Sequence, residues 1–168
     1  MPIIESILAE TTYEASNTRR LLERVPEDRW DWKPHEKSMT LQRLSGHLAE
    51  IYGWAEQTLG ADELDFAAGN YETFLPQTRE QLLGAHDRAM ETFRKHAQGM
   101  SDEKLMATWT LRNGDTVLMQ QPRVVAVRGF MLNHAIHHRG QLSVYLRQLG
   151  VALPALYGNS ADESAFGG

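Results

Sequence analysis

Two histidines near the end of the sequence, His134 and His138, are spaced so that both could bind one metal ion. Residues four apart lie on the same face of a helix, one turn from each other, so their imidazole nitrogens could meet at a shared ion. The sequence has seven histidines, and this spacing arises by chance in a fair fraction of such chains. The spacing alone therefore leaves a ligand role and a structural role equally open.

The position of the pair within its helix favours the ligand role. Steps of four and three residues define one apolar stripe with the pair in its middle: Val127, Met131, His134, His138, Leu142, Tyr145 and Leu149. Two imidazoles in the centre of a buried stripe each need a polar partner, and the surrounding apolar side chains supply none. A shared metal ion would satisfy both.

A third histidine, His47, is the candidate that completes the site. It follows Leu44 by three residues and precedes Ile51 by four, so it points along the inward side of its own predicted helix. A lone inward histidine is more often a hydrogen-bonded core residue than a ligand. Together with His134 and His138, however, it gives three neutral nitrogen ligands, the number typical of catalytic sites that keep positions open for water or substrate.

Two other metal motifs are excluded by neighbouring residues. The residue after His134 is Ala135, whereas the helix of a zinc peptidase carries a glutamate base there. Di-iron bundles use Glu-x-x-His elements, and no glutamate in this sequence precedes a histidine by three residues. A divalent ion remains the expected cofactor, and its identity stays open because imidazole ligands suit zinc, nickel, copper and iron alike.

Further polar residues are weaker candidates for a role in catalysis. His137 lies at the flank of the histidine stripe and could be an outer hydrogen-bonding group, a proton carrier or a residue at the edge of the bundle. Glu50 lies one turn beyond His47, where it could orient the imidazole, although a solvated surface glutamate is the commoner case. Tyr157, Asp162 and Glu163 could supply an acid or a base, but a packing tyrosine with solvated acids is the more frequent arrangement.

The bulk composition is that of an ordinary globular protein. The chain has 168 residues, 42% of them hydrophobic and 23% charged, which suits one domain over residues 1–168. A net charge of −5 with scattered basic residues argues against nucleic-acid binding, and no stretch approaches a membrane span. The first residues, MPIIESILAETTYEA, do not resemble a signal or transit peptide, so we expect a cytoplasmic protein. Without cysteine, any thiol chemistry must use a thiol brought by a substrate.

Hydrophobic periodicity predicts an all-α four-helix bundle. Helical patterns cover about residues 2–24, 40–60, 76–99 and 127–149, with Ser38 or Thr40 as an N-cap, Pro76 opening the third helix and Gly150 ending the last. The connection containing Trp30 and Trp32 is expected to be ordered. Residues 107–120 place Asn113-Gly114 between β-prone runs, which predicts a small hairpin or irregular excursion in a long connection between helices three and four. The apolar start of the segment after Val151 suggests that it packs back on the bundle.

The last helix and its continuation, HAIHHRGQLSVYLRQLG and ALPALYGNSADE, resemble the DinB-like family of metalloenzymes, also called the DinB/YfiT superfamily. The likeness extends to WDWKPHEKSMTLQRLSGHLAEI, where a small residue, an apolar residue and then His47 match the family's first ligand. The resemblance implies a four-helix bundle with an unusual connection order, a homodimer, and a nickel, zinc or similar ion held by His47, His134 and His138. It spans most of the chain, with the third helix and the hairpin least diagnostic.

Some members of that family are thiol-dependent transferases or isomerases, so the resemblance implies a transferase in which the ion activates a low-molecular-weight thiol for attack on a small electrophile. A metal-dependent hydrolase in the same site is one alternative. A dimeric stress-response or binding protein with a structural metal is another, and the sequence fixes no general base that would decide among them.

Overall fold

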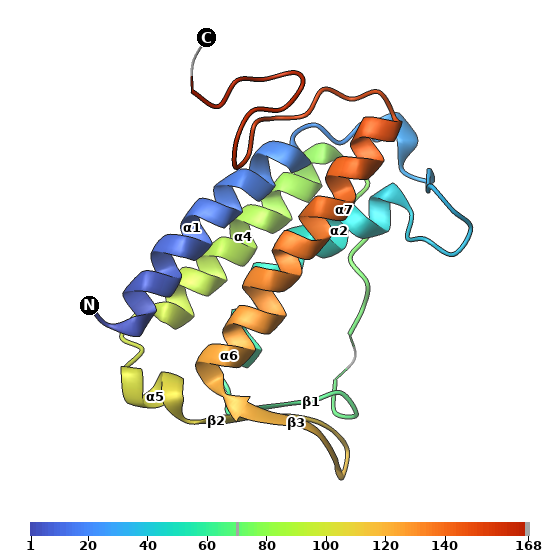
Figure 1. Ribbon diagram of the computed structural model, residues 1–168. Helices are drawn as coiled ribbons and strands as arrows, with labels where there is room; N and C mark the ends of the chain where they lie inside the picture. The colour runs from blue at the N-terminus through green and yellow to red at the C-terminus, as the bar shows by residue number, and fades with distance from the viewer. Residues whose placement is uncertain (70, 167–168) are drawn as a thin grey trace.

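A computed structural model of the protein, which describes residues 1–69 and 71–166, shows a helical bundle with a small sheet at one end (Figure 1). Helices α1 (Ile3–Leu22) and α4 (Arg79–Ala97) lie side by side, and both pack against α2 (Leu41–Glu50). Helix α7 (His134–Gln148) closes the bundle against α1 and α2. The predicted bundle is therefore present, and its first three helices lie within the predicted ranges, whereas the last starts at Arg123, four residues before the predicted Val127.

Two of the four long helices are composite. Helix α2 continues through the 3₁₀ turn η2 (Ile51–Trp54) into the short helix α3 (Ala55–Thr58). The last helix starts as α6 (Arg123–Val127) and passes through the π-helical segment η3 (Arg128–Asn133) before α7. A π turn holds an extra residue, and such turns are frequent at functional sites. This one ends immediately before His134.

The prediction of an all-α protein is wrong in one respect, because the structure contains a three-stranded sheet in the order β1-β2-β3. Strand β1 (Glu63–Asp65) pairs parallel with β2 (Thr108–Asn113), and β2 pairs antiparallel with β3 (Thr116–Pro122). A further short helix, α5 (Asp102–Met106), precedes β2, and a 3₁₀ turn, η1 (Glu27–Arg29), follows α1. Strand β1 has only three residues, which are too few for an alternation of polar and apolar side chains to reveal a strand in the sequence.

The hairpin itself was predicted, but its turn lies one residue later than the Asn113-Gly114 pair suggested. Asn113 pairs with Thr116, which leaves Gly114 and Asp115 as the two turn residues. Gly114 has φ +58°, the sign that a two-residue hairpin turn requires at its first central position. The Asp65 carboxylate accepts the Gly114 N–H at 2.9 Å, so the turn is also held by the β1 strand.

Arg123 joins the sheet to the bundle. Its guanidinium is 1% exposed and donates to the backbone carbonyls of Thr58 at 2.9 Å, Lys104 at 3.2 Å and Ala61, and it pairs with the Asp62 carboxylate. A buried arginine with all its hydrogen bonds satisfied fixes the surrounding backbone. The start of the last helix is thereby held against the end of α3.

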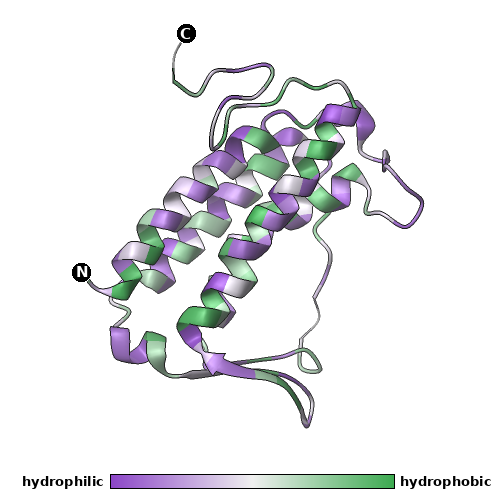
Figure 2. Cartoon of the chain, in the orientation of Figure 1, coloured by the Kyte–Doolittle hydropathy of each residue, from purple (hydrophilic) through white to green (hydrophobic). Residues whose placement is uncertain are grey.

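The helix ends follow ordinary capping rules. Thr40 caps α2 by accepting the Arg43 N–H, as predicted, and Gly150 ends α7 with φ +74°. Helix α4 starts at Arg79 with Thr78 as its cap, three residues after the predicted start at Pro76. Hydrophobic and hydrophilic residues alternate around the long helices (Figure 2), which bury one face each.

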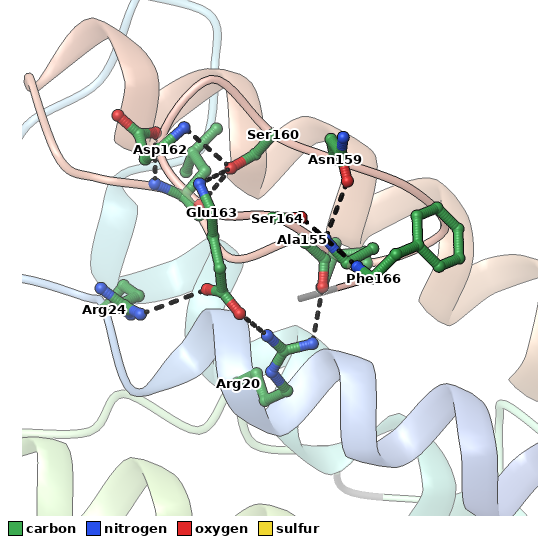
Figure 3. Close-up of polar contacts among 12 residues, drawn as sticks. Arg20, Arg24, Ala155, Asn159, Ser160, Asp162, Glu163, Ser164 and Phe166 are labelled. Atoms are coloured by element: carbon green, nitrogen blue, oxygen red, sulfur yellow. Dashed lines mark hydrogen bonds and ion pairs between the residues drawn. The ribbon is translucent and has the colours of Figure 1, made fainter. Parts of the chain in front are cut away.

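The segment after α7 packs back on the bundle, as its apolar start suggested. The Arg20 guanidinium donates to the Ala155 carbonyl, and Glu163 pairs with Arg20 and Arg24 (Figure 3). In the described part of the chain, no helix is both long and apolar enough to cross a membrane.

His86 is a buried histidine outside the predicted site. It is 2% exposed, its ring packs edge-on against Tyr52, and neither ring nitrogen has a hydrogen-bond partner among the described residues. The nearest carboxylate oxygen, on Asp87, is 3.7 Å from Nδ1. Burial lowers the pKa of His86 to about 4, although Asp87 opposes the shift, while Arg19 and Arg94 add to it. The histidine is therefore neutral in the folded protein.

We expect His86 to make the protein sensitive to acid. Its folded-state pKa is lower than the unfolded value, so its contribution to stability is complete above about pH 6.5 and is lost as the pH falls towards 4. The metal-free wild type should lose about 2–3 kcal/mol more between pH 7.5 and 4.5 than His86→Leu, measured by urea unfolding. If the free energies of unfolding of the two proteins fell in parallel between pH 7.5 and 4.5, this role of His86 would be contradicted.

Candidate metal centre

The three predicted histidines meet between α2 and α7. Nε2 of His47 lies 3.3 Å from Nε2 of His134, which lies 2.8 Å from Nε2 of His138. All three offer a ligand nitrogen within 4.8 Å of the others, and no other group of His, Asp or Glu in the described residues does so. His138 is 7% exposed, whereas His47 and His134 are half-buried. The cluster therefore has one face open to solvent.

The hydrogen bonds around the cluster direct lone pairs into it. Nδ1 of His138 is 2.7 Å from the Gln141 Oε1 atom, and because an amide oxygen only accepts, the proton must lie on Nδ1. The Nε2 lone pair of His138 then faces the other two rings. A single proton between imidazoles can satisfy two nitrogens, whereas a metal ion can satisfy all three.

The spacing suits a small divalent ion. Nitrogen ligands about 2.1 Å from an ion lie roughly 3.4 Å apart in tetrahedral geometry and roughly 3.0 Å apart at right angles. The observed separations of 3.3 and 2.8 Å are close to these values. The donor set of three imidazoles therefore fits nickel, zinc or a similar ion, with further positions left for water or substrate.

Burial keeps the ligands in the form that binds metal. It is the main cause that lowers the pKa of His138 to about 4, with Gln141 opposing the shift and the other histidines adding to it. Burial also lowers the pKa of His134, as does the neighbouring His47. Neutral imidazole is the metal-binding form.

The positions of α2 and α7 are fixed next to the cluster by the Trp30–Trp32 connection. The first N–H groups of α2, on Leu41 and Gln42, donate to the carbonyls of Trp32 and Trp30 at 2.8 and 3.0 Å. Trp32 packs edge-on against Tyr145 of α7, whose hydroxyl donates to the carbonyl of Met39 at 3.2 Å. The connection is ordered, as predicted, and it sets the distance between the two ligand helices.

Three further side chains surround the histidines. Trp54 packs against His47 and His134 with ring centroids 5.4 and 5.2 Å apart, and Gln141 holds His138. Glu50 places Oε1 3.5 Å from Nδ1 of His47, so the position noted in the sequence does face the imidazole. Trp54 and Gln141 were missed, although each lies seven residues, or two helical turns, after a histidine.

The other candidate residues lie outside the cluster. His137 is exposed on α7, its ring centroid 4.9 Å from that of His138. Tyr157 donates to the Glu14 carboxylate at 2.6 Å and accepts from Arg139, and Glu163 pairs with Arg20. Asp162 pairs with Arg147. Through these contacts, Tyr157, Asp162 and Glu163 hold the C-terminal segment against α1 and α7.

Comparison with known proteins places this geometry in a family. The model of the DinB family matches residues 4–166. The chain belongs to the DinB family. A curated relative, the uncharacterized protein YrdA of Bacillus subtilis (strain 168), is 24% identical over 165 residues, which span 96% of this chain and 92% of YrdA.

Solved structures of DinB-like proteins share the fold. One from Bacillus cereus ATCC 10987 aligns with a TM-score of 0.72 and 22% identity, covering 91% of this chain and 97% of its own. YjoA from Bacillus subtilis aligns with a TM-score of 0.65 and 21% identity, covering 86% of this chain and 92% of its own. The chain therefore has a DinB-like fold.

Tyr157 should affect stability and not metal binding. Glu14 and Arg139 are 7% and 2% exposed, and Tyr157→Phe removes two hydrogen bonds to this buried ion pair, one to each partner. The variant should be about 1–3 kcal/mol less stable in urea unfolding, with an unchanged metal dissociation constant. If Tyr157→Phe kept the stability of the wild type but lost metal affinity, Tyr157 would instead belong to the metal centre.

Proposed function

We propose that this DinB family protein binds one divalent metal ion through His47, His134 and His138 and uses it to transfer a low-molecular-weight thiol to a small electrophile. The observation that carries the proposal is the convergence of three Nε2 atoms in a half-buried cluster with an open face. Three protein ligands leave room for an exogenous ligand, as in catalytic sites and unlike closed structural ones.

The open positions of the cluster suit an exogenous nucleophile, which we propose is a thiol. The donor cluster contains no carboxylate in the described residues, and Glu50 faces the outer nitrogen of His47. A bound ion would act as a Lewis acid that lowers the pKa of a coordinated thiol, and it would lower the pKa of a coordinated water in the alternative hydrolase. In a substitution, the sulfur–carbon bond forms, the leaving group departs with its electron pair, and the thiol proton passes to solvent.

The protein's own residues hold and shape the site. Gln141 keeps the Nε2 lone pair of His138 directed into the cluster, and Trp54 forms an apolar wall beside His47 and His134. An apolar wall excludes water on one side and strengthens electrostatic interactions at the open positions. His137 is exposed, with its ring centroid 4.9 Å from that of His138.

Replacement of any one ligand by alanine should abolish metal binding. Saturating zinc or nickel at about 100 times the dissociation constant should stabilise the wild type by about 2.7 kcal/mol, which raises Tm by about 5–10 °C. His47→Ala, His134→Ala and His138→Ala should show no such rise while keeping most of their helicity. His35→Ala removes an exposed histidine outside the cluster and is the control. Full metal occupancy in His138→Ala would contradict the proposed ligand set.

The proposed reaction is tested by a thiol-transfer screen of the metal-loaded protein with several low-molecular-weight thiols and small electrophiles. We expect metal-dependent loss of free thiol with at least one pair, and none with His134→Ala. A protein that binds metal and gains stability but consumes no thiol would favour the non-catalytic alternative, in which the ion is structural.

A further inference from the structure

One face of α2 is covered by an extended segment, residues 71–76, which we call the α2 strap. Gln42, Gly46 and Glu50 are four residues apart and form one stripe along the helix. Nε2 of Gln42 donates to the Pro76 carbonyl at 2.9 Å, and the Tyr71 hydroxyl donates to Glu50 at the other end. The strap therefore runs antiparallel to α2, with a contact at every turn.

Between these two contacts, the strap touches the backbone of α2 at Gly46. A Cβ atom on Gly46 would lie 2.5 Å from the Phe74 carbonyl oxygen and 2.8 Å from Cδ of Pro76. Glycine is unfavourable inside a helix, so its presence here is explained by the close approach of the strap. Gly46 directly precedes the ligand His47.

The strap reaches the metal centre through Glu50. The Glu50 side chain is 20% exposed, so it is not a freely solvated surface carboxylate. Its Oε1 atom lies 3.5 Å from Nδ1 of His47 and also accepts the Tyr71 hydroxyl. In the described residues, no arginine or lysine forms an ion pair with Glu50. Tyr71 thus holds the carboxylate on the side of the ring opposite the Nε2 atom that faces His134.

We propose that Glu50 is a positioning residue for His47 and that the strap, through Tyr71, sets the metal affinity of the centre. A carboxylate that accepts the Nδ1–H of a ligand imidazole fixes its tautomer and orientation and makes Nε2 a stronger donor. This inference rests on the proposed function, because it concerns how tightly the three histidines hold an ion.

Metal affinity, measured by competition with a chromogenic zinc chelator, is the first test. Glu50→Ala should bind zinc about 10–100-fold more weakly than wild type, and Glu50→Gln should recover part of the loss because its amide oxygen can still accept. Tyr71→Phe removes the hydroxyl that holds Glu50, and Gly46→Ala displaces the strap. Both should weaken zinc binding by smaller factors, since the Glu50 carboxylate itself is still present.

Two matched controls separate the strap from general effects of these substitutions. Gly53→Ala adds a Cβ atom whose nearest neighbour is 3.6 Å away, so it should leave the zinc affinity unchanged. Tyr13→Phe removes a tyrosine hydroxyl that donates to the Leu156 carbonyl in the C-terminal segment, and it should behave like wild type. Equal losses in Gly46→Ala and Gly53→Ala would overturn the role of the strap.

The His47 tautomer provides a readout without metal. Long-range ¹H–¹⁵N spectra of the metal-free protein should show the proton of His47 on Nδ1 in wild type and a shift towards Nε2 in Glu50→Ala. If the wild type binds zinc, and Glu50→Ala keeps both the zinc affinity and the His47 tautomer of the wild type, this inference alone is overturned. Absence of zinc binding by the wild type would overturn the proposed function, while the tautomer would still report whether Glu50 orients His47.

Discussion

The approach of three imidazole Nε2 atoms to one another between α2 and α7 is the constraint on which the rest of the structure depends. At separations of 3.3 and 2.8 Å, three converging lone pairs repel one another, and one shared proton satisfies only two of the nitrogens, so the third calls for a positive charge. Burial keeps His134 and His138 from supplying that charge by protonation, because it lowers the pKa of both side chains. A divalent ion resolves the conflict for all three rings together.

The helix that carries two of the ligands is unusually polar on its buried side, and different neighbours satisfy its polar residues. His138 faces the metal centre and Gln141, whereas the next residue, Arg139, turns towards α1 and pairs with Glu14. Tyr157 of the C-terminal segment completes that pair. The C-terminal segment therefore stabilises the core of the same helix that carries His134 and His138, without reaching the histidine cluster.

Helical periodicity was enough to predict the four long helices and the inward direction of the three histidines, because those properties are local. The caps at Thr40 and Gly150 were predictable for the same reason. The pairing of β1 with β2 joins residues more than 40 positions apart, and no local pattern in three residues of β1 indicates it. The start of α4 was misplaced because Pro76, a good first residue for a helix, is held extended against α2.

Among the residues around the ligands, too, the sequence indicates some roles, and only the folded structure reveals the others. Glu50 could be noticed because it lies one turn from His47, but its contact with Tyr71 depends on where the strap runs and appears only in the fold. The role of Gly46 was equally invisible, since a glycine in a helix can have several causes and only the position of Phe74 distinguishes them. Family membership supports the site without specifying these outer contacts, and the DinB scaffold leaves the reaction to be decided by experiment.

The central claim is that the three histidines hold one ion, and elemental analysis tests it most directly. The protein should be purified without a polyhistidine tag, equilibrated with zinc or nickel, and freed of unbound metal by gel filtration. The structure predicts about one divalent ion per chain in the wild type and close to none in His134→Ala. A stoichiometry near zero in the metal-replete wild type would contradict the account.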